Sequence, residues 1–170
     1  ALTRSREQES VSSQAPTVDG DWEDLYAFFP WEDWRQGRPE VLDTQILPGL
    51  DKWLEKDARA ADRVRLAFGR DGAQWDEEFV LERYELLYEA SLVEEALVDQ
   101  GSKGRRQPKP ALGLALHLDH RRILATALGR LRSKLKYRPV IFDLMPSGFT
   151  LRALQSTTEM VMGEIGRAHV

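Results

Sequence analysis

The chain has 170 residues, of which 42% are hydrophobic and 31% are charged, a balance typical of soluble globular proteins. It contains no cysteine, which excludes disulfides and thiolate metal sites. No apolar run approaches the roughly 18 to 20 residues that a membrane-spanning helix needs, and residues 1–19 hold no signal-peptide core. The sequence therefore predicts a cytoplasmic protein of one ordinary domain or two small ones, without membrane contact.

The net charge of −4 conceals an uneven distribution along the chain. Residues 1–102 hold 11 Lys/Arg against 24 Asp/Glu, whereas residues 103–170 hold 13 against 4. This asymmetry indicates that the second half binds polyanions such as nucleic acid. The alternative is a solvated surface whose charge is merely uneven, and charge alone does not decide between the two.

The N-terminal part begins with residues 1–20, which are rich in Ser, Gln and Glu and predict a flexible lead-in. Six aromatic side chains then occur in the thirteen residues 22–34. Acidic residues lie between these rings, which argues against base stacking, where Lys or Arg is expected. The aromatic cluster therefore predicts packing in a core or an interface.

Three helical stretches are expected next, over residues 39–54, 58–68 and 76–99, because their apolar residues recur at spacings of three and four. Pro48 is expected to break or kink the first stretch, and Gly69 to end the second.

Composition divides the chain further. We expect a helical body over 21–100, a basic linker over 101–116 that is rich in Gly and Pro, and a second unit over 117–170.

The second unit has its own helix signals. Asp119 is a suitable N-cap for a helix over 120–137, which carries a Leu stripe on one side and many cations on the others. Pro139 ends this helix, and the apolar segment 140–146 predicts a short strand or buried turn. Thr150 is the expected N-cap of another helix. The order of helix, short strand and helix is that of a winged helix-turn-helix, although the element expected to read the major groove is absent.

Signals for catalysis or metal binding are weak. No GxSxG, HExxH, P-loop or GxGxxG pattern occurs, and His117 and His120 lie among positive charges, which favours a structural or exposed role. Residues 84–92 imitate the second half of a Nudix pyrophosphohydrolase motif, but Tyr84 replaces its Arg, Tyr88 replaces a metal-binding Glu, and Ser91 replaces its Gly. We therefore interpret this segment as a structural helix and expect no catalytic residue, metal or cofactor in the chain.

Residues 119–163 resemble the C-terminal module of Nudix-related transcription regulators of NAD metabolism, the NrtR-like group. The similar segments are DHRRILATALGRLRSKLKY at 119–137 and FTLRALQ at 149–155. Upstream, YAFFPWEDWR at 26–35 and RYELLYEA at 83–90 resemble an alphaproteobacterial branch labelled "NAD regulator". The resemblance covers about 20–163.

The resemblance implies a Nudix-like sensor domain for a nucleotide such as ADP-ribose, joined to a winged-helix domain that binds double-stranded DNA as a homodimer. Against that plan, 21–100 corresponds to the end of the sensor and connecting helices. The nucleotide site would lie in a missing N-terminal domain, and the recognition helix would follow the present C-terminus. We therefore interpret the chain as a fragment.

Together these observations predict a mainly α fold, with a helical body and an incomplete, C-terminal winged helix-turn-helix-like module. The predicted function is DNA-binding transcriptional regulation of NAD-related metabolism. Seven side chains are predicted to contact DNA phosphates: Arg121, Arg122, Arg130, Arg132, Lys134, Lys136 and Arg152. Two alternatives stay open: an appendage of a Nudix hydrolase of ADP-ribose pyrophosphatase type whose catalytic half lies upstream, and a protein-interaction or dimerisation module.

Overall fold

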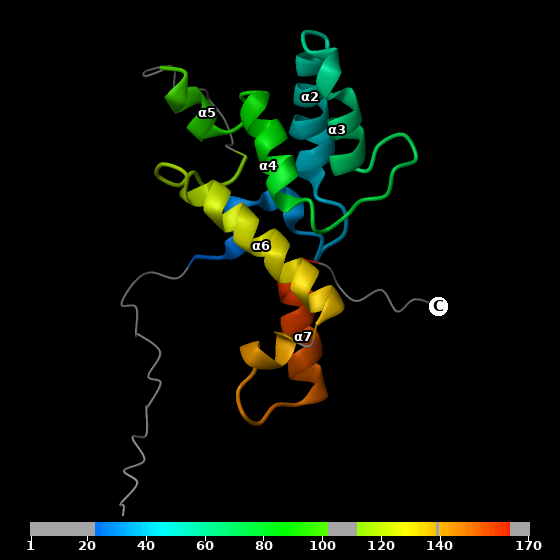
Figure 1. Cartoon of the computed structure of the whole chain (residues 1–170), viewed down its shortest axis with the longest axis vertical. Helices are drawn as coiled ribbons and strands as arrows, with labels where there is room; N and C mark the ends of the chain where they lie inside the picture. The colour runs from blue at the N-terminus through cyan, green and yellow to red at the C-terminus, as the bar shows by residue number, and fades with distance from the viewer. Residues whose placement is uncertain (1–22, 102–111, 139, 164–170) are drawn as a thin grey trace, which may run out of the picture.

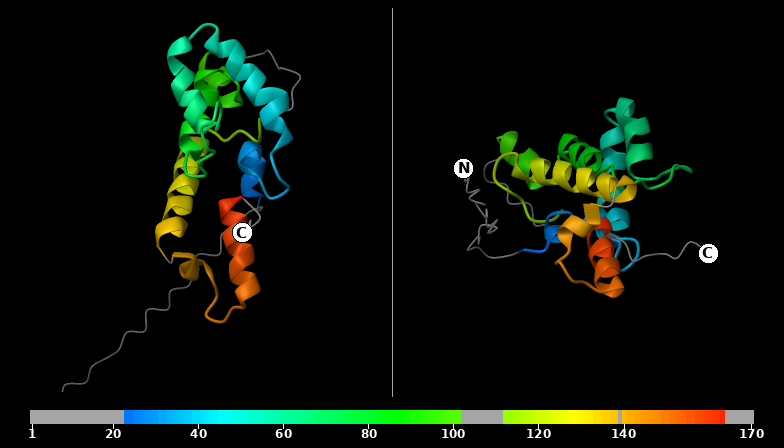
Figure 2. Two further views of the ribbon diagram at one scale, coloured as in Figure 1. Left: turned by 90° about the vertical axis from the view of Figure 1, so that its right-hand side faces the viewer. Right: turned by 60° about the horizontal axis from the view of Figure 1, so that its bottom comes forward.

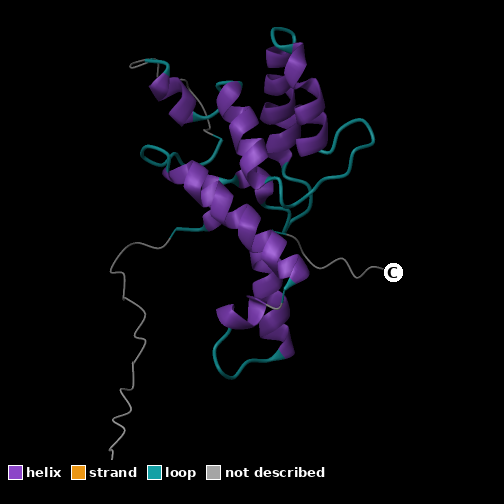
Figure 3. Cartoon of the chain, viewed as in Figure 1, coloured by secondary structure: helices purple, strands orange, loops and turns teal. Residues whose placement is uncertain are grey.

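The computed structural model describes residues 23–101, 112–138 and 140–163. Within these ranges the protein is mainly helical, as predicted, and contains no β-strand beyond a single bridge between Arg35 and Gly37. Figure 3 shows helices joined by loops, with no strand among the elements drawn. The predicted lead-in 1–20 and most of the predicted linker lie outside the described residues.

The aromatic segment forms the centre of the core, as predicted. It contains helix α1 (Leu25–Phe28), capped by Asp24, whose carboxylate accepts from the Tyr26 amide, and the 3-10 turn η1 (Pro30–Glu32). Phe29 and Trp31 are fully buried, with ring centroids 5.9 Å apart in an edge-to-face arrangement. The acidic side chain of Glu32 is buried with them.

The first two predicted helical stretches are confirmed with local changes. The first consists of the π-helical turn η2 (Leu42–Ile46) and helix α2 (Leu47–Leu54). Pro48 lies in the first turn of α2, where its missing N–H is tolerated. In place of the predicted break or kink, the structure has the wider π-helical turn η2 directly before α2. The second consists of the 3-10 turn η3 (Ala58–Ala60) and helix α3 (Ala61–Ala67).

The prediction of one long helix over 76–99 is wrong. The structure has α4 (Val80–Glu89) and α5 (Glu94–Asp99), separated at Ser91, whose φ is +56°. The Leu92 amide donates to the Leu87 carbonyl at 2.8 Å, which terminates α4. Val93 and Ala96, which follow the break, are also buried. The apolar periodicity therefore continues across the break, and the sequence pattern gives no sign that the chain changes direction there.

The C-terminal part begins with α6 (His120–Tyr137), whose bounds are those predicted. Of the short strand or buried turn predicted over 140–146, the structure has a turn, because Val140–Leu144 form the 3-10 turn η4; none of its residues is buried. Helix α7 (Leu151–Met162) follows, and its predicted N-cap is confirmed, since the Thr150 hydroxyl accepts from the Ala153 amide at 3.1 Å. The described residues thus supply helix, turn and helix, and the winged-helix assignment stays a prediction.

Helix α6 belongs to the same core as the N-terminal helices. It packs across α4, and Ala125 and Leu128 are buried in one cluster with Val80 and Leu86 (Figure 1). Gly129 permits this approach, because a Cβ there would lie 2.9 Å from the Glu78 carbonyl oxygen. The division expected at 101–116 therefore does not separate two cores.

We call η4, α7 and the C-terminal half of α6 the C-terminal lobe. Helix α7 runs back alongside α6 (Figure 2), yet neither α7 nor η4 contains a buried residue among those described, apart from Gly163 at the end of α7. None of the helices in the described ranges combines the length and the apolar composition that a membrane span requires.

Candidate nucleic-acid interface

The seven cations predicted to contact phosphate do not form one surface. Two are buried, two are engaged in surface ion pairs, and three are exposed without an ion pair to another described residue. These groups differ in what each side chain can offer to an external anion.

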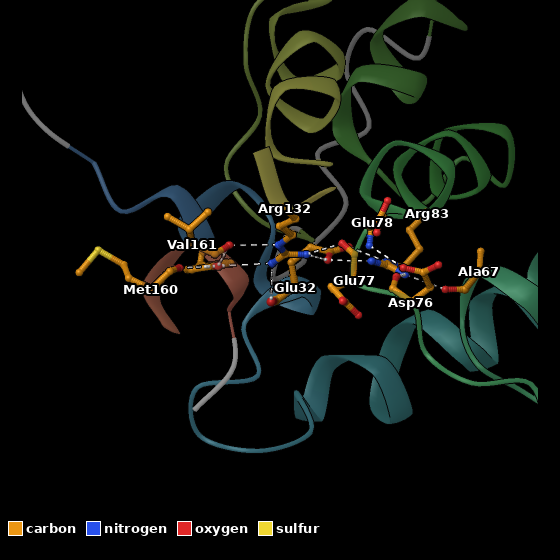
Figure 4. Close-up of polar contacts among 10 residues, drawn as sticks. Glu32, Ala67, Asp76, Glu77, Glu78, Arg83, Arg132, Met160 and Val161 are labelled. Atoms are coloured by element: carbon orange, nitrogen blue, oxygen red, sulfur yellow. Dashed lines mark hydrogen bonds and ion pairs between the residues drawn. The ribbon is translucent and has the colours of Figure 1, made fainter. Parts of the chain in front are cut away.

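Arg132 is one of the two buried cations, and its predicted contact with DNA is wrong. Its side chain is 1% exposed, and it donates from Nη1 to Glu32 Oε2 at 2.6 Å and from Nε to the Val161 carbonyl at 3.1 Å (Figure 4). Its other contacts are the Glu77 and Glu32 carbonyls and the Tyr26 hydroxyl. All its N–H groups are thus directed at internal acceptors, and none is free for a phosphate.

Glu32 receives a second guanidinium on its other side. Arg83 donates from Nε to Glu32 Oε1 at 2.6 Å and from Nη2 to Glu32 Oε2 at 2.9 Å, and its guanidinium lies 3.8 Å from the centroid of the Trp75 ring. Burial by itself opposes ionisation of Glu32, but the charges and hydrogen bonds of Arg83 and Arg132 outweigh it and hold the pKa of Glu32 below its ordinary value. We call Glu32, Arg83, Arg132 and Tyr26 the Glu32 cluster.

The Glu32 cluster fixes the end of α7. The Tyr26 hydroxyl donates to the Met160 carbonyl at 2.7 Å, and the Trp34 amide donates to the Gly163 carbonyl at 2.6 Å. With the bond from Arg132 to Val161, these contacts give hydrogen-bond donors to the Met160, Val161 and Gly163 carbonyls and place a cation at the negative end of the helix dipole. The cluster therefore sets the position of the C-terminal lobe relative to the body.

Arg121 is the second buried cation, and its predicted DNA contact is also wrong. It is fully buried, pairs with Glu95 at 3.2 Å, and donates to the Phe28 carbonyl and, in a close contact, to the Leu112 carbonyl. Burial lowers the pKa of Arg121, and the negative charge of Glu95 opposes that shift. Arg121 thus holds α5 and the segment before α6 against the aromatic core.

Two further cations of α6 form surface ion pairs with the body. Arg122 pairs with Glu85 at 2.5 Å and with Asp119, and Lys136 pairs with Glu77 at 3.2 Å and Glu78 at 3.5 Å. Both side chains are partly exposed, and the described structure gives them acidic partners already. A phosphate would have to compete with these carboxylates, so neither is a strong candidate.

Replacing Arg122 with Gln is expected to lower the free energy of unfolding by about 0.5 kcal/mol, because partly exposed ion pairs contribute little net energy. Urea unfolding followed by tryptophan fluorescence measures this change. A loss above about 2 kcal/mol would instead show that this ion pair contributes as much to stability as a buried ion pair does.

Arg130, Lys134 and Arg152 remain as candidate phosphate contacts. Arg130 and Lys134 lie four residues apart on the exposed side of α6, and Arg152 is the second residue of α7. The prediction missed Arg138, which is also exposed and continues the same spacing of four, the signal that would have identified it. Like charges at this spacing repel each other by a few tenths of a kcal/mol, roughly 0.2 to 0.5 per pair, and no described acid offsets the repulsion.

The carboxylates that imitate a Nudix motif are engaged by arginines. Glu85 pairs with Arg122, and Glu89 forms a two-pronged pair with Arg63 at 2.9 Å through each oxygen. Among the described residues, no group of three or more His, Asp or Glu side chains is arranged to hold a metal ion. His117 and His120 are both exposed.

A scan of protein-family models and a search of curated proteins found no match to this chain.

Proposed function

We propose that this chain is part of a cytoplasmic DNA-binding regulator of NAD-related genes, and that its C-terminal lobe contacts the phosphates of duplex DNA. The observation that carries the proposal is the distribution of ion pairs. Most of the cations on α6 are paired with carboxylates or carbonyls of the body, whereas Arg130 and Lys134 are exposed in series without a described acidic partner. Arg152 adds a third such charge.

The position of Arg152 supports this role. It lies in the first turn of α7, where backbone N–H groups point out of the helix and the helix dipole favours an anion. In helix-turn-helix proteins the helix that precedes the recognition helix lies across the DNA backbone, and its contacts position the protein without reading sequence. We propose that α7 acts in this way and that no residue of this chain is catalytic.

Replacing Arg130, Lys134 and Arg152 together with Gln is expected to weaken DNA binding and reduce its dependence on salt. Each phosphate contact contributes about 0.9 to the slope of log affinity against log salt, so the slope should fall by about 2.7. Fluorescence anisotropy with labelled duplexes at several salt concentrations measures both quantities. Unrelated duplex sequences should show the same loss.

The matched control replaces three cations of the body with Gln: Lys52, Lys56 and Arg59. These side chains are exposed on the acidic half, so the net charge changes equally while the C-terminal lobe is untouched. We expect the slope of the wild-type protein in this variant. If both triple variants lose the same slope, or if DNA binding is indifferent to salt, the proposed interface is wrong.

A further inference from the structure

The body has a groove between α3 and α4 that no described segment fills. Its volume is about 480 Å³, and its apolar lining includes Leu66, Phe79 and Leu81. Leu66 is 47% exposed and Phe79 is 39% exposed, so two large apolar side chains meet solvent in one hollow. A volume of this size accommodates several side chains of a partner.

The lining of the groove carries more negative than positive charge, because its charged side chains are the carboxylates of Glu78, Glu82 and Glu85 and the guanidinium of Arg63. Each lining carboxylate pairs with a cation that it shares with a second carboxylate outside the lining. Glu82 shares Arg63 with Glu89, Glu85 shares Arg122 with Asp119, and Glu78 shares Lys136 with Glu77. Because each cation is divided between two carboxylates, negative charge remains at the lining, and it favours a cationic occupant with apolar side chains.

The C-terminal lobe carries a surface that combines exposed apolar side chains with positive charge. Its tip presents four large apolar side chains, which are 42 to 80% exposed: Phe142, Leu144, Phe149 and Leu151. The rings of Phe142 and Phe149 lie 5.9 Å apart, so they form one patch. Arg152 follows directly in the chain, and Lys134 and Arg130 supply two further positive charges on the lobe.

We propose that the groove between α3 and α4 binds the tip of the C-terminal lobe from a second copy of this chain. The apolar tip matches the apolar side chains of the lining, and the three cations of the lobe that have no described acidic partner match the negative charge of the lining. The tip is held away from the groove of its own chain, because α3 and α4 lie on one side of α6 and the loop before α7 lies on the other (Figure 1), and the Glu32 cluster fixes α7 to the body. Association through this contact does not require DNA.

Docking of a second copy would cover Leu151 and its neighbour Arg152, which is one of the proposed phosphate contacts. A second copy and a DNA duplex would therefore compete for the same lobe. Added duplex should then dissociate the assembled copies.

Sedimentation velocity over a range of protein concentrations tests the contact directly. Leu66→Gln alters only the groove, and Leu151→Gln alters only the tip; both side chains are exposed, so folding should be unaffected. Each variant is expected to weaken self-association by about tenfold or more, the fold-change for removing one buried leucine contact. Val98→Gln, at an exposed apolar residue of α5, is the matched control and should associate as the wild type does.

Mixing the two variants distinguishes this arrangement from others. The Leu66→Gln protein keeps an intact tip and the Leu151→Gln protein keeps an intact groove, so a mixture should regain association that neither shows alone. If Leu66→Gln associates as the wild type does, the groove is not part of the contact and the proposal is wrong. A wild-type chain that stays monomeric at every concentration also overturns it, whether or not the lobe binds DNA.

Discussion

Replacing Glu32 with Gln is expected to lower the free energy of unfolding by about 3 to 5 kcal/mol. The carboxylate is fully buried and accepts hydrogen bonds from Arg83 and Arg132, both at 2.6 Å at their closest. A neutral amide leaves two buried guanidinium ions without a counter-charge and directs its own N–H groups toward other donors. Urea unfolding followed by circular dichroism at pH 7 measures the loss.

The matched control is Glu78→Gln, which removes a carboxylate from a partly exposed pair with Lys136. Its expected cost is below about 1 kcal/mol. Equal losses in the two variants would show that the charge of Glu32 contributes no more than a surface charge. The contrast therefore measures the effect of burial on an ion pair within one protein.

The pH dependence of unfolding in the wild type and in Glu32→Gln tests whether the charge of the Glu32 carboxylate causes this loss of stability. Because the folded-state pKa of Glu32 is lowered from 4.5, its charge stabilises the fold above the unfolded-state pKa, and this contribution is lost as pH falls through the folded value. The difference in unfolding free energy between wild type and Glu32→Gln should be constant near neutral pH and shrink below about pH 4.5. Other acids with lowered pKa, such as Asp33, are common to both proteins and cancel.

The helices were predictable where local signals specify them. The bounds of α6 are those predicted from Asp119 and Pro139, although the Asp119 side chain makes no capping hydrogen bond and pairs with Arg122 instead. The start of α7 followed from its N-cap Thr150. The break between α4 and α5 was not predictable, because it depends on a left-handed backbone conformation at Ser91, which serine seldom adopts. The periodicity of apolar residues indicates which side of a helix is buried, but it does not indicate where one helix ends and the next begins in another direction.

The roles of the cations were not predictable from composition. Arg121 and Arg132 lie on the same helix as Arg130 and Lys134, and all four have the residue type that phosphate contacts require. Arg121 and Arg132 are buried because each pairs with a distant carboxylate that approaches only on folding. Glu95 lies 26 residues from Arg121 in the chain, and Glu32 lies 100 residues from Arg132. Spacing on the helix does indicate which cations are buried. One buried stripe of α6 consists of Arg121, Ala125, Leu128 and Arg132. A cation at a position on such a stripe predicts a hydrogen-bond partner inside the protein.

Replacing Gly163 with Ala is expected to lower the free energy of unfolding by about 2 kcal/mol or more and to loosen α7. Gly163 has a φ of +72°, where a side chain is strained, and a Cβ there would lie 2.4 Å from the Glu32 carbonyl oxygen and 2.7 Å from Arg132 Nη2. The added methyl group therefore separates the end of α7 from the Glu32 cluster. Hydrogen exchange of the α7 amides and urea unfolding measure the two effects.

Gly148→Ala is the control, because Gly148 lies just before α7 and a Cβ there would meet no atom within 4 Å. Its effect on unfolding should stay within about 0.5 kcal/mol, and α7 should exchange as in the wild type. Since α7 has no buried residue of its own, its position depends on the contacts at its C-terminal end. Unchanged exchange of α7 in Gly163→Ala would mean instead that packing along α6 is sufficient to hold the C-terminal lobe in place.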